Sequence, residues 1–150
     1  MSDLLALYQE VILDHTKRPR NFRALTEPSR HAEGYNPLCG DKVTIYLRMV
    51  GDRISEISFQ GSGCAISTAS ASILTESLKG KTRSEADALF ELFHDLVTGK
   101  GEGNGKLLPL GKLAVFSGVS EFPTRVKCAT LAWHTFRSAL SGTGETATTE

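Results

Sequence analysis

Four residues in three separate segments of the chain have side chains that could bind one metal ion. Cys39 and Asp41 lie two residues apart across a glycine, and the other two cysteines lie further along the chain. In extended backbone, side chains at i and i+2 point to the same side, so Cys39 and Asp41 could hold one ion together. Three thiolates and one carboxylate are a donor set that suits tetrahedral zinc. The sequence therefore predicts a zinc site formed by Cys39, Asp41, Cys64 and Cys128.

The same residues also have simpler interpretations. Scattered cysteines are often buried small hydrophobic residues, and Asp41 could be a turn residue before a strand. Three cysteines cannot all pair in disulfides, and a reducing cytosol does not favour disulfides. Local context favours the metal, since Cys64 opens a helical segment whose dipole stabilises a thiolate.

Composition limits the protein class. The chain has 150 residues, and 17 basic residues balance 17 acidic ones, so charge gives no case for nucleic acid binding. It lacks an apolar run of the roughly 18 residues that would span a bilayer, and its N-terminus lacks the features of a signal peptide. We expect a cytoplasmic protein with no membrane or nucleic acid partner. We expect one domain over residues 1–140, followed by a disordered tail over residues 141–150.

The first half of the chain predicts a helix, a loop and a hairpin. Apolar residues at helical spacing predict a helix over residues 3–15, with His15 at its C-terminal end as a surface residue. Residues 20–36 are polar and predict a surface loop. Alternating apolar residues predict a β-hairpin over residues 43–60, with its turn at residues 51–52.

The second half predicts helices. One helix runs from Cys64 to about Leu78, and its many small residues predict a close packing partner. A second follows a capping box formed by Ser84 and Asp87 and ends near residue 98. Residues 99–105 form a glycine-rich loop without the pattern of a phosphate loop. A short helix over residues 107–116 and a final helix that begins near Pro123 complete the chain.

Three segments carry a resemblance to a known family. They are the Asn-Pro-Leu-Cys-Gly-Asp of residues 36–41, the Gly-Ser-Gly-Cys of residues 61–64 and the Arg-Val-Lys-Cys of residues 125–128. Together with the Pro-Arg-Asn of residues 19–21, they resemble the IscU-like proteins of iron–sulfur cluster assembly, also known as NifU N-terminal domain-like proteins. The resemblance runs from residue 4 to about residue 140. It implies an α+β fold, with a small antiparallel sheet made of the 43–60 hairpin and a third strand, and with helices packed on it.

Two features resemble the SufU branch of this family. Lys127 precedes the last cysteine where proteins of the Isc branch carry a histidine, and residues 80–105 form an extra stretch. SufU-like proteins are zinc-dependent sulfurtransferases. They accept persulfide sulfur from a SufS-type, pyridoxal-phosphate-dependent cysteine desulfurase and pass it to the downstream Suf cluster-assembly scaffold. The resemblance implies that Cys39 is the sulfur acceptor, that Asp41, Cys64 and Cys128 complete the zinc site, and that Arg125 engages the desulfurase.

Two other functions remain open at this point. The same cysteines could assemble a [2Fe–2S] cluster, which would make the protein a scaffold. Alternatively, a closed four-coordinate zinc site could only stabilise the fold of an interaction module. Lys127 favours the sulfur carrier over the scaffold, because a lysine must lose a proton before it can ligate a metal. Gly40, beside Cys39, argues against a purely rigid site.

Overall fold

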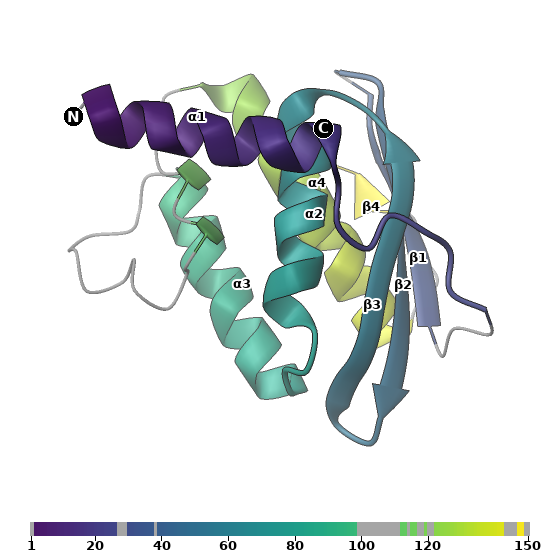
Figure 1. The fold of residues 1–150 in the computed structure, drawn as a ribbon. Helices are drawn as coiled ribbons and strands as arrows, with labels where there is room; N and C mark the ends of the chain where they lie inside the picture. The colour runs from purple at the N-terminus through teal and green to yellow at the C-terminus, as the bar shows by residue number, and fades with distance from the viewer. Residues whose placement is uncertain are drawn as a thin grey trace.

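Three antiparallel strands form the sheet of this α+β fold in the computed structural model, namely β1 (Arg30–Asn36), β2 (Asp41–Val50) and β3 (Arg53–Ser62). The structure describes residues 2–26, 30–37, 39–98, 112–113, 115–116, 119, 122–142 and 147–148. β2 lies between β3 and β1, and the two-residue strand β4 (Ala147–Thr148) pairs in parallel with β1 (Figure 1). The predicted fold class, with its hairpin and third strand, is confirmed.

The third strand comes from a segment that the sequence predicted as loop. Within residues 20–36, the last seven residues form β1 and pair with β2 from Arg30↔Leu47 to Asn36↔Asp41. Ala32, Gly34 and Asn36 are buried and alternate with exposed neighbours. Because none of the three is large and apolar, the period-two pattern of a half-buried strand was hidden in the sequence.

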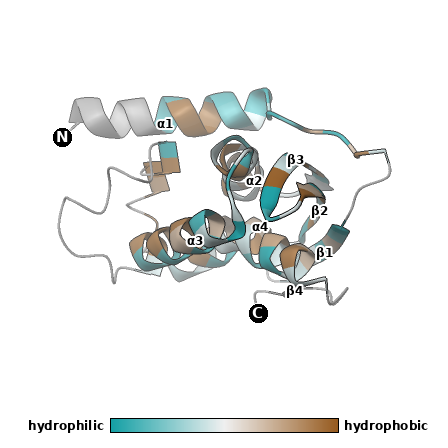
Figure 2. Ribbon diagram, turned by 90° about the horizontal axis from the view of Figure 1, so that it is seen from below, coloured by the Kyte–Doolittle hydropathy of each residue, from teal (hydrophilic) through white to brown (hydrophobic). Residues whose placement is uncertain are grey.

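Two helices pack on one face of the sheet, and two more pack on those helices. α2 (Ala65–Leu78) and α4 (Pro123–Ser141) contact the strands and each other. α1 (Ser2–Lys17) lies across α2, and α3 (Arg83–Thr98) packs against α4. Figure 2 looks along α2, with the sheet on one side and α3 on the other. α4 is the close partner that the small residues of α2 predicted, and the Ser70 hydroxyl donates to the Ala129 carbonyl at 2.6 Å.

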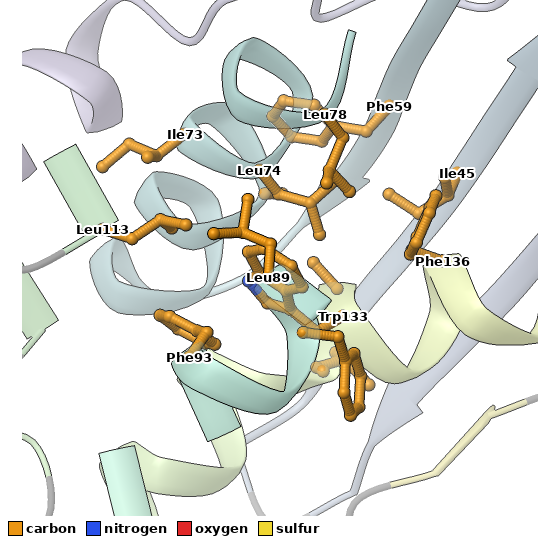
Figure 3. Close-up of a cluster of buried hydrophobic side chains, with 14 of the residues drawn as sticks. Ile45, Phe59, Ile73, Leu74, Leu78, Leu89, Phe93, Leu113, Trp133 and Phe136 are labelled. Carbon is orange, nitrogen blue, oxygen red and sulfur yellow. The ribbon is translucent and has the colours of Figure 1, made fainter. Parts of the chain in front are cut away.

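The core lies between the sheet and these helices. Ile45 and Phe59 project from the strands toward α2 and α4, where Leu74 and Phe136 meet them (Figure 3). On the side of α3, the ring of Trp133 stacks on Phe93 at 4.8 Å between centroids. Burial of this apolar surface fixes α4 between the sheet and α3, and α4 carries one of the predicted metal ligands.

His15 is not the surface residue that the sequence predicted. Its side chain is only 1 % exposed, and its Nδ1 lies 2.6 Å from the Ser72 hydroxyl of α2. The same hydroxyl accepts the backbone N–H of Arg20 at 2.8 Å. Burial, followed by the charge of Arg20, lowers the pKa of His15 below its usual value. The helix end therefore lies against α2, because the Ser72 hydroxyl satisfies a polar ring nitrogen there.

Three smaller predictions also change. The capping box of α3 is formed by Thr82 and Glu85 rather than Ser84 and Asp87, with each side chain bonded to the other's backbone N–H at 3.2 and 3.0 Å. The prediction of a disordered tail is wrong for Ala147 and Thr148, because these two residues pair with the edge of β1. Residues 112–113 and 115–116 adopt 3₁₀ turns within the predicted 107–116 helix.

The predicted glycine-rich loop of residues 99–105 lies outside the described residues. Among the helices that the structure describes, none is long and apolar enough to cross a lipid bilayer.

Candidate metal centre

Cys39 lies in the loop that joins β1 to β2. The Gly40 N–H donates to the Asn36 carbonyl at 2.9 Å and closes this loop, and Gly40 has a φ of 72°. That left-handed conformation is one that glycine adopts without strain. Cys39 is the exposed cysteine of the three. Its side chain therefore stands on a short loop and is open to solvent.

Asp41 begins β2, and its carboxylate is fully buried. Oδ1 accepts the backbone N–H of Cys64 at 2.8 Å. A Cβ on residue 63 would lie 2.5 Å from the same oxygen, so Gly63 lets the chain pass close to the carboxylate. Asp41 makes no ion pair with any basic side chain that the structure describes. A buried carboxylate with only neutral partners is costly, which favours a bound cation at this point.

Cys64 is the N-cap residue of α2. Its Sγ accepts the backbone N–H of Ser67 at 3.4 Å and lies 3.9 Å from Oδ2 of Asp41. The first turn of a helix carries partial positive charge, so a thiolate is stabilised at this position. The helical start predicted at Cys64 is therefore confirmed.

Cys128 lies in the second turn of α4 and is 3 % exposed. Its Sγ is 3.4 Å from the Sγ of Cys39, and the bond from Ser70 to Ala129 fixes this part of α4 against α2. Burial, followed by contacts with Cys39 and Asp41, raises the pKa of Cys128 above its usual value. Without a cation, burial favours the neutral thiol, whereas metal coordination would favour the thiolate.

The structure brings three of the predicted ligands into one cluster. Ligand atoms of Cys39, Asp41 and Cys128 all lie within 4.8 Å of one another. Cys64 is not part of that cluster, but it touches the carboxylate of Asp41. Two sulfurs bound to one zinc at about 2.3 Å would lie roughly 3.8 Å apart. The 3.4 Å between Cys39 and Cys128 is close to that value, so the donors present fit a zinc ion.

The sequence did not assign a role to Asn36 in this centre. Its side chain is fully buried, and its amide donates to Oδ2 of Asp41 at 3.2 Å and to the Sγ of Cys128 at 3.6 Å. Asn36 is the register partner of Asp41 across β1 and β2. The signal that would have found it is this strand pairing, which was missed when β1 was predicted as loop. Asn36 orients two predicted ligands that come from different elements.

Arg125 lies apart from the cluster, on the exposed first turn of α4. Its guanidinium sits 4.5 Å from the centre of the Phe122 ring, and Phe122 is 46 % exposed. An Arg held over an aromatic face loses less conformational freedom when it binds a partner. The structure leaves this side chain available to another molecule.

Comparison with known proteins assigns the family. The model of the NifU-like N-terminal domain matches residues 7–129, which include all four predicted ligands. The chain belongs to this family. The resemblance to IscU-like proteins is therefore confirmed for most of the chain.

Two relatives and one solved structure are similar to this chain over most of its length. The chain is 38 % identical over 140 residues to the zinc-dependent sulfurtransferase SufU of Bacillus subtilis, covering 93 % of each protein. It is 39 % identical to the iron–sulfur cluster assembly scaffold protein IscU of Streptococcus pyogenes, covering 93 % of this chain and 86 % of the relative. The crystal structure of a putative iron–sulfur cluster assembly scaffold protein for the SUF system, from Fervidobacterium islandicum, matches with a TM-score of 0.81. It is 36 % identical and covers 87 % of this chain and 94 % of that one.

Proposed function

We propose that this protein works in iron–sulfur cluster assembly as a zinc-dependent sulfur carrier of the SufU type. The observation that carries the proposal is the placement of Cys39, an exposed thiol on a short loop that contacts a buried cysteine. Its proposed sulfur donor is a SufS-type cysteine desulfurase, and its proposed acceptor is a downstream cluster-assembly scaffold. The similarity to the B. subtilis sulfurtransferase supports this choice.

The four predicted ligands differ in how firmly the fold holds them. Cys64 caps α2, Cys128 lies in α4 and Asp41 lies in β2, so moving any of these three would disturb a regular element. Cys39 lies on a loop beside Gly40, which can change its backbone angles at low cost. Zinc, when bound, keeps these thiols deprotonated at neutral pH, and a thiolate is the nucleophile in thiol exchange. Cys39 is therefore the ligand that can leave and attack a persulfide.

A scaffold is the second candidate function, and the relatives named as scaffolds favour it. The two functions share the cysteines but differ in what accumulates on them. A carrier would hold a sulfane sulfur on Cys39, and a scaffold would hold a stable iron–sulfur cluster. Lys127, which precedes Cys128, favours the carrier, since it is a poor ligand at neutral pH.

The acceptor role of Cys39 can be tested with a SufS-type desulfurase supplied with cysteine. We expect faster turnover when this protein is present, and mass spectrometry without reductant should find the added sulfur on Cys39. Cys39→Ala should abolish the stimulation, and Leu13→Ala, on an exposed site of α1, should leave it unchanged. Sulfur that accumulates on Cys128, or a stable cluster without persulfide, would favour the scaffold.

Arg125 is proposed to bind the desulfurase through paired hydrogen bonds to a carboxylate or carbonyl. Arg125→Ala should weaken activation by about tenfold in apparent affinity while zinc content stays intact. Phe122→Ala should have a smaller effect in the same direction, because the ring only positions the guanidinium. If Arg125→Ala loses zinc together with activity, the residue is structural instead.

A further inference from the structure

Cys128 lies where a second reaction of the sulfur carrier could take place. Its Sγ is 3.4 Å from the Sγ of Cys39, within the roughly 3–3.5 Å separation of reacting atoms poised for attack. The two sulfurs would need to approach by roughly 1.4 Å to reach a disulfide bond length of about 2.05 Å. Cys39 lies on a loop, so that movement need not displace a helix.

The two thiols also differ in their exposure to solvent. Cys39 is exposed, so a sulfur delivered by another protein arrives from the solvent side. Cys128 is 3 % exposed and lies on the protein side of Cys39. Displacement at sulfur requires the attacking and leaving atoms to lie roughly in line across the central sulfur. Burial of one thiol and exposure of the other are compatible with this alignment.

Cys64 is placed less well for the same attack. Its Sγ accepts the N–H of Ser67 and lies beside Asp41, and it does not belong to the cluster within 4.8 Å that joins Cys39 to Cys128. Of the two remaining cysteines, Cys128 is therefore the one that the fold sets against Cys39.

We propose that Cys128 attacks the Cys39 persulfide and releases its outer sulfur as sulfide. This inference rests on the proposed function, because it needs a persulfide on Cys39. The bond between the Cys39 sulfur and the outer sulfur breaks, and a disulfide between Cys39 and Cys128 forms. The two cysteine sulfurs are oxidised, and the outer sulfur is reduced to HS⁻, which keeps the persulfide proton. Any proton on Cys128 goes to solvent, and a thiol reductant restores the two cysteines afterwards.

Coordination of Cys128 decides between two fates of the sulfur. While Cys128 is a metal ligand, its electron pair is engaged, and the sulfur stays on Cys39 for transfer to another protein. When the metal is removed, that electron pair is no longer engaged. Cys128 then attacks through its minor thiolate form, its proton goes to solvent, and sulfide is released. Asn36, which donates to Cys128 at 3.6 Å, helps to hold it in the first of these states.

The experiment starts with the zinc-loaded protein, treated with inorganic polysulfide and desalted. Peptide mapping first locates the added sulfur on Cys39. A chelator is then added to one half of the sample, and released sulfide is trapped with a bimane reagent. We expect sulfide in amounts equal to the persulfide lost, together with a non-reduced peptide pair that links Cys39 to Cys128. The half without chelator should keep its persulfide. The rate should not depend on protein concentration, as befits an intramolecular step.

Cys64→Ser and Cys128→Ser form a matched pair, because each loses one predicted ligand but only the second loses the attacking thiol. Cys64→Ser should release sulfide even without chelator. Cys128→Ser should keep its persulfide after chelation, with release slowed by about tenfold or more. Circular dichroism checks that both variants are folded, and wild-type protein treated with chelator tests the same point without substitution.

Three outcomes would overturn the inference. The first is equal sulfide release from both variants, the second is a disulfide to Cys64, and the third is a persulfide that survives chelation in the wild type. Each of these leaves the sulfur carrier itself intact, because a persulfide has formed on Cys39. If no sulfur can be placed on Cys39 by polysulfide or by a desulfurase, the proposed function fails, and this inference fails with it.

Discussion

Two buried polar clusters lie against α2, and they differ in how their charges and hydrogen bonds are satisfied. In the first, Nδ1 of His15 lies 2.6 Å from the Ser72 hydroxyl, which also accepts the backbone N–H of Arg20, and Nε2 of His15 lies 3.5 Å from a carboxylate oxygen of Glu76. The second joins Asp41 and Cys128 through Asn36, beside two further thiols. It holds a carboxylate and three sulfurs, which are mainly acceptors when ionised. The first cluster has no surplus of acceptors that would attract a metal, whereas the second is one that a bound cation would stabilise.

This difference teaches that burial of polar groups alone does not mark a metal centre. His15 is as well buried as Asp41, and both lie between elements that are far apart in the sequence. What separates them is chemistry: the imidazole has a hydroxyl at one nitrogen and a carboxylate near the other, whereas the Asp41 carboxylate is buried with only neutral hydrogen-bond partners.

The largest expected effect comes from removing zinc. We expect about one zinc per chain, with Zn–S distances of about 2.3 Å. The predicted ligands tie a loop, a strand, α2 and α4 together, so chelation should cost about 4 kcal/mol and lower the Tm by roughly 8–16 °C. Cys64→Ser and Cys128→Ser should lower the Tm in the same way, as calorimetry can measure. An unchanged Tm in the metal-free protein would show that the second cluster, like the first, is stable without a bound cation.

An intermediate effect separates the two clusters by substitution. Asn36→Leu removes the donor shared by Asp41 and Cys128, so zinc affinity should fall by about 10–100-fold in a chelator competition. His15→Ala should instead cost about 1–3 kcal/mol of stability, because it removes a buried hydrogen bond.

The two variants serve as controls for each other. Zinc affinity should stay at the wild-type value in His15→Ala, and the loss of stability in His15→Ala should be the same with and without zinc. A loss of zinc affinity in His15→Ala would mean that the two clusters are coupled through α2.

The smallest effect concerns pH. Burial, followed by the charges of His94 and Arg137, lowers the pKa of His134 on α4, so the folded protein favours its neutral form. The unfolded chain takes up the proton near its ordinary value of 6.5, so the contribution of His134 to stability is complete above that pH. It is lost as the pH falls from there through the lower folded pKa.

The direction of this pH dependence can be checked by urea unfolding of the zinc-loaded wild type and of His134→Gln, at about pH 7.5, 6.5 and 5.5. The wild type should lose free energy of unfolding relative to the variant as the pH falls. A difference that does not change with pH would show that His134 titrates alike in both states.

The sequence by itself determined several features of this protein. The alternation in β2 and β3 predicted the hairpin, because these strands bury large apolar side chains with a clear period, and helical spacing of apolar residues predicted α1. The residue types and motifs around Cys39, Cys64 and Cys128 predicted the family and a candidate donor set, since thiolates and carboxylates are common metal ligands.

Only the tertiary structure decided the rest. β1 buries small and polar residues, and its place in the sheet depends on pairing with β2, which leaves no periodic apolar pattern in the sequence. That pairing brings Asn36 opposite Asp41, and the packing of α4 on α2 brings Cys128 to within 3.4 Å of Cys39. His15 is buried for the same reason: its partner, Ser72, lies 57 residues away in the chain. Contacts between distant segments are set by how the elements pack, and local sequence carries little record of them.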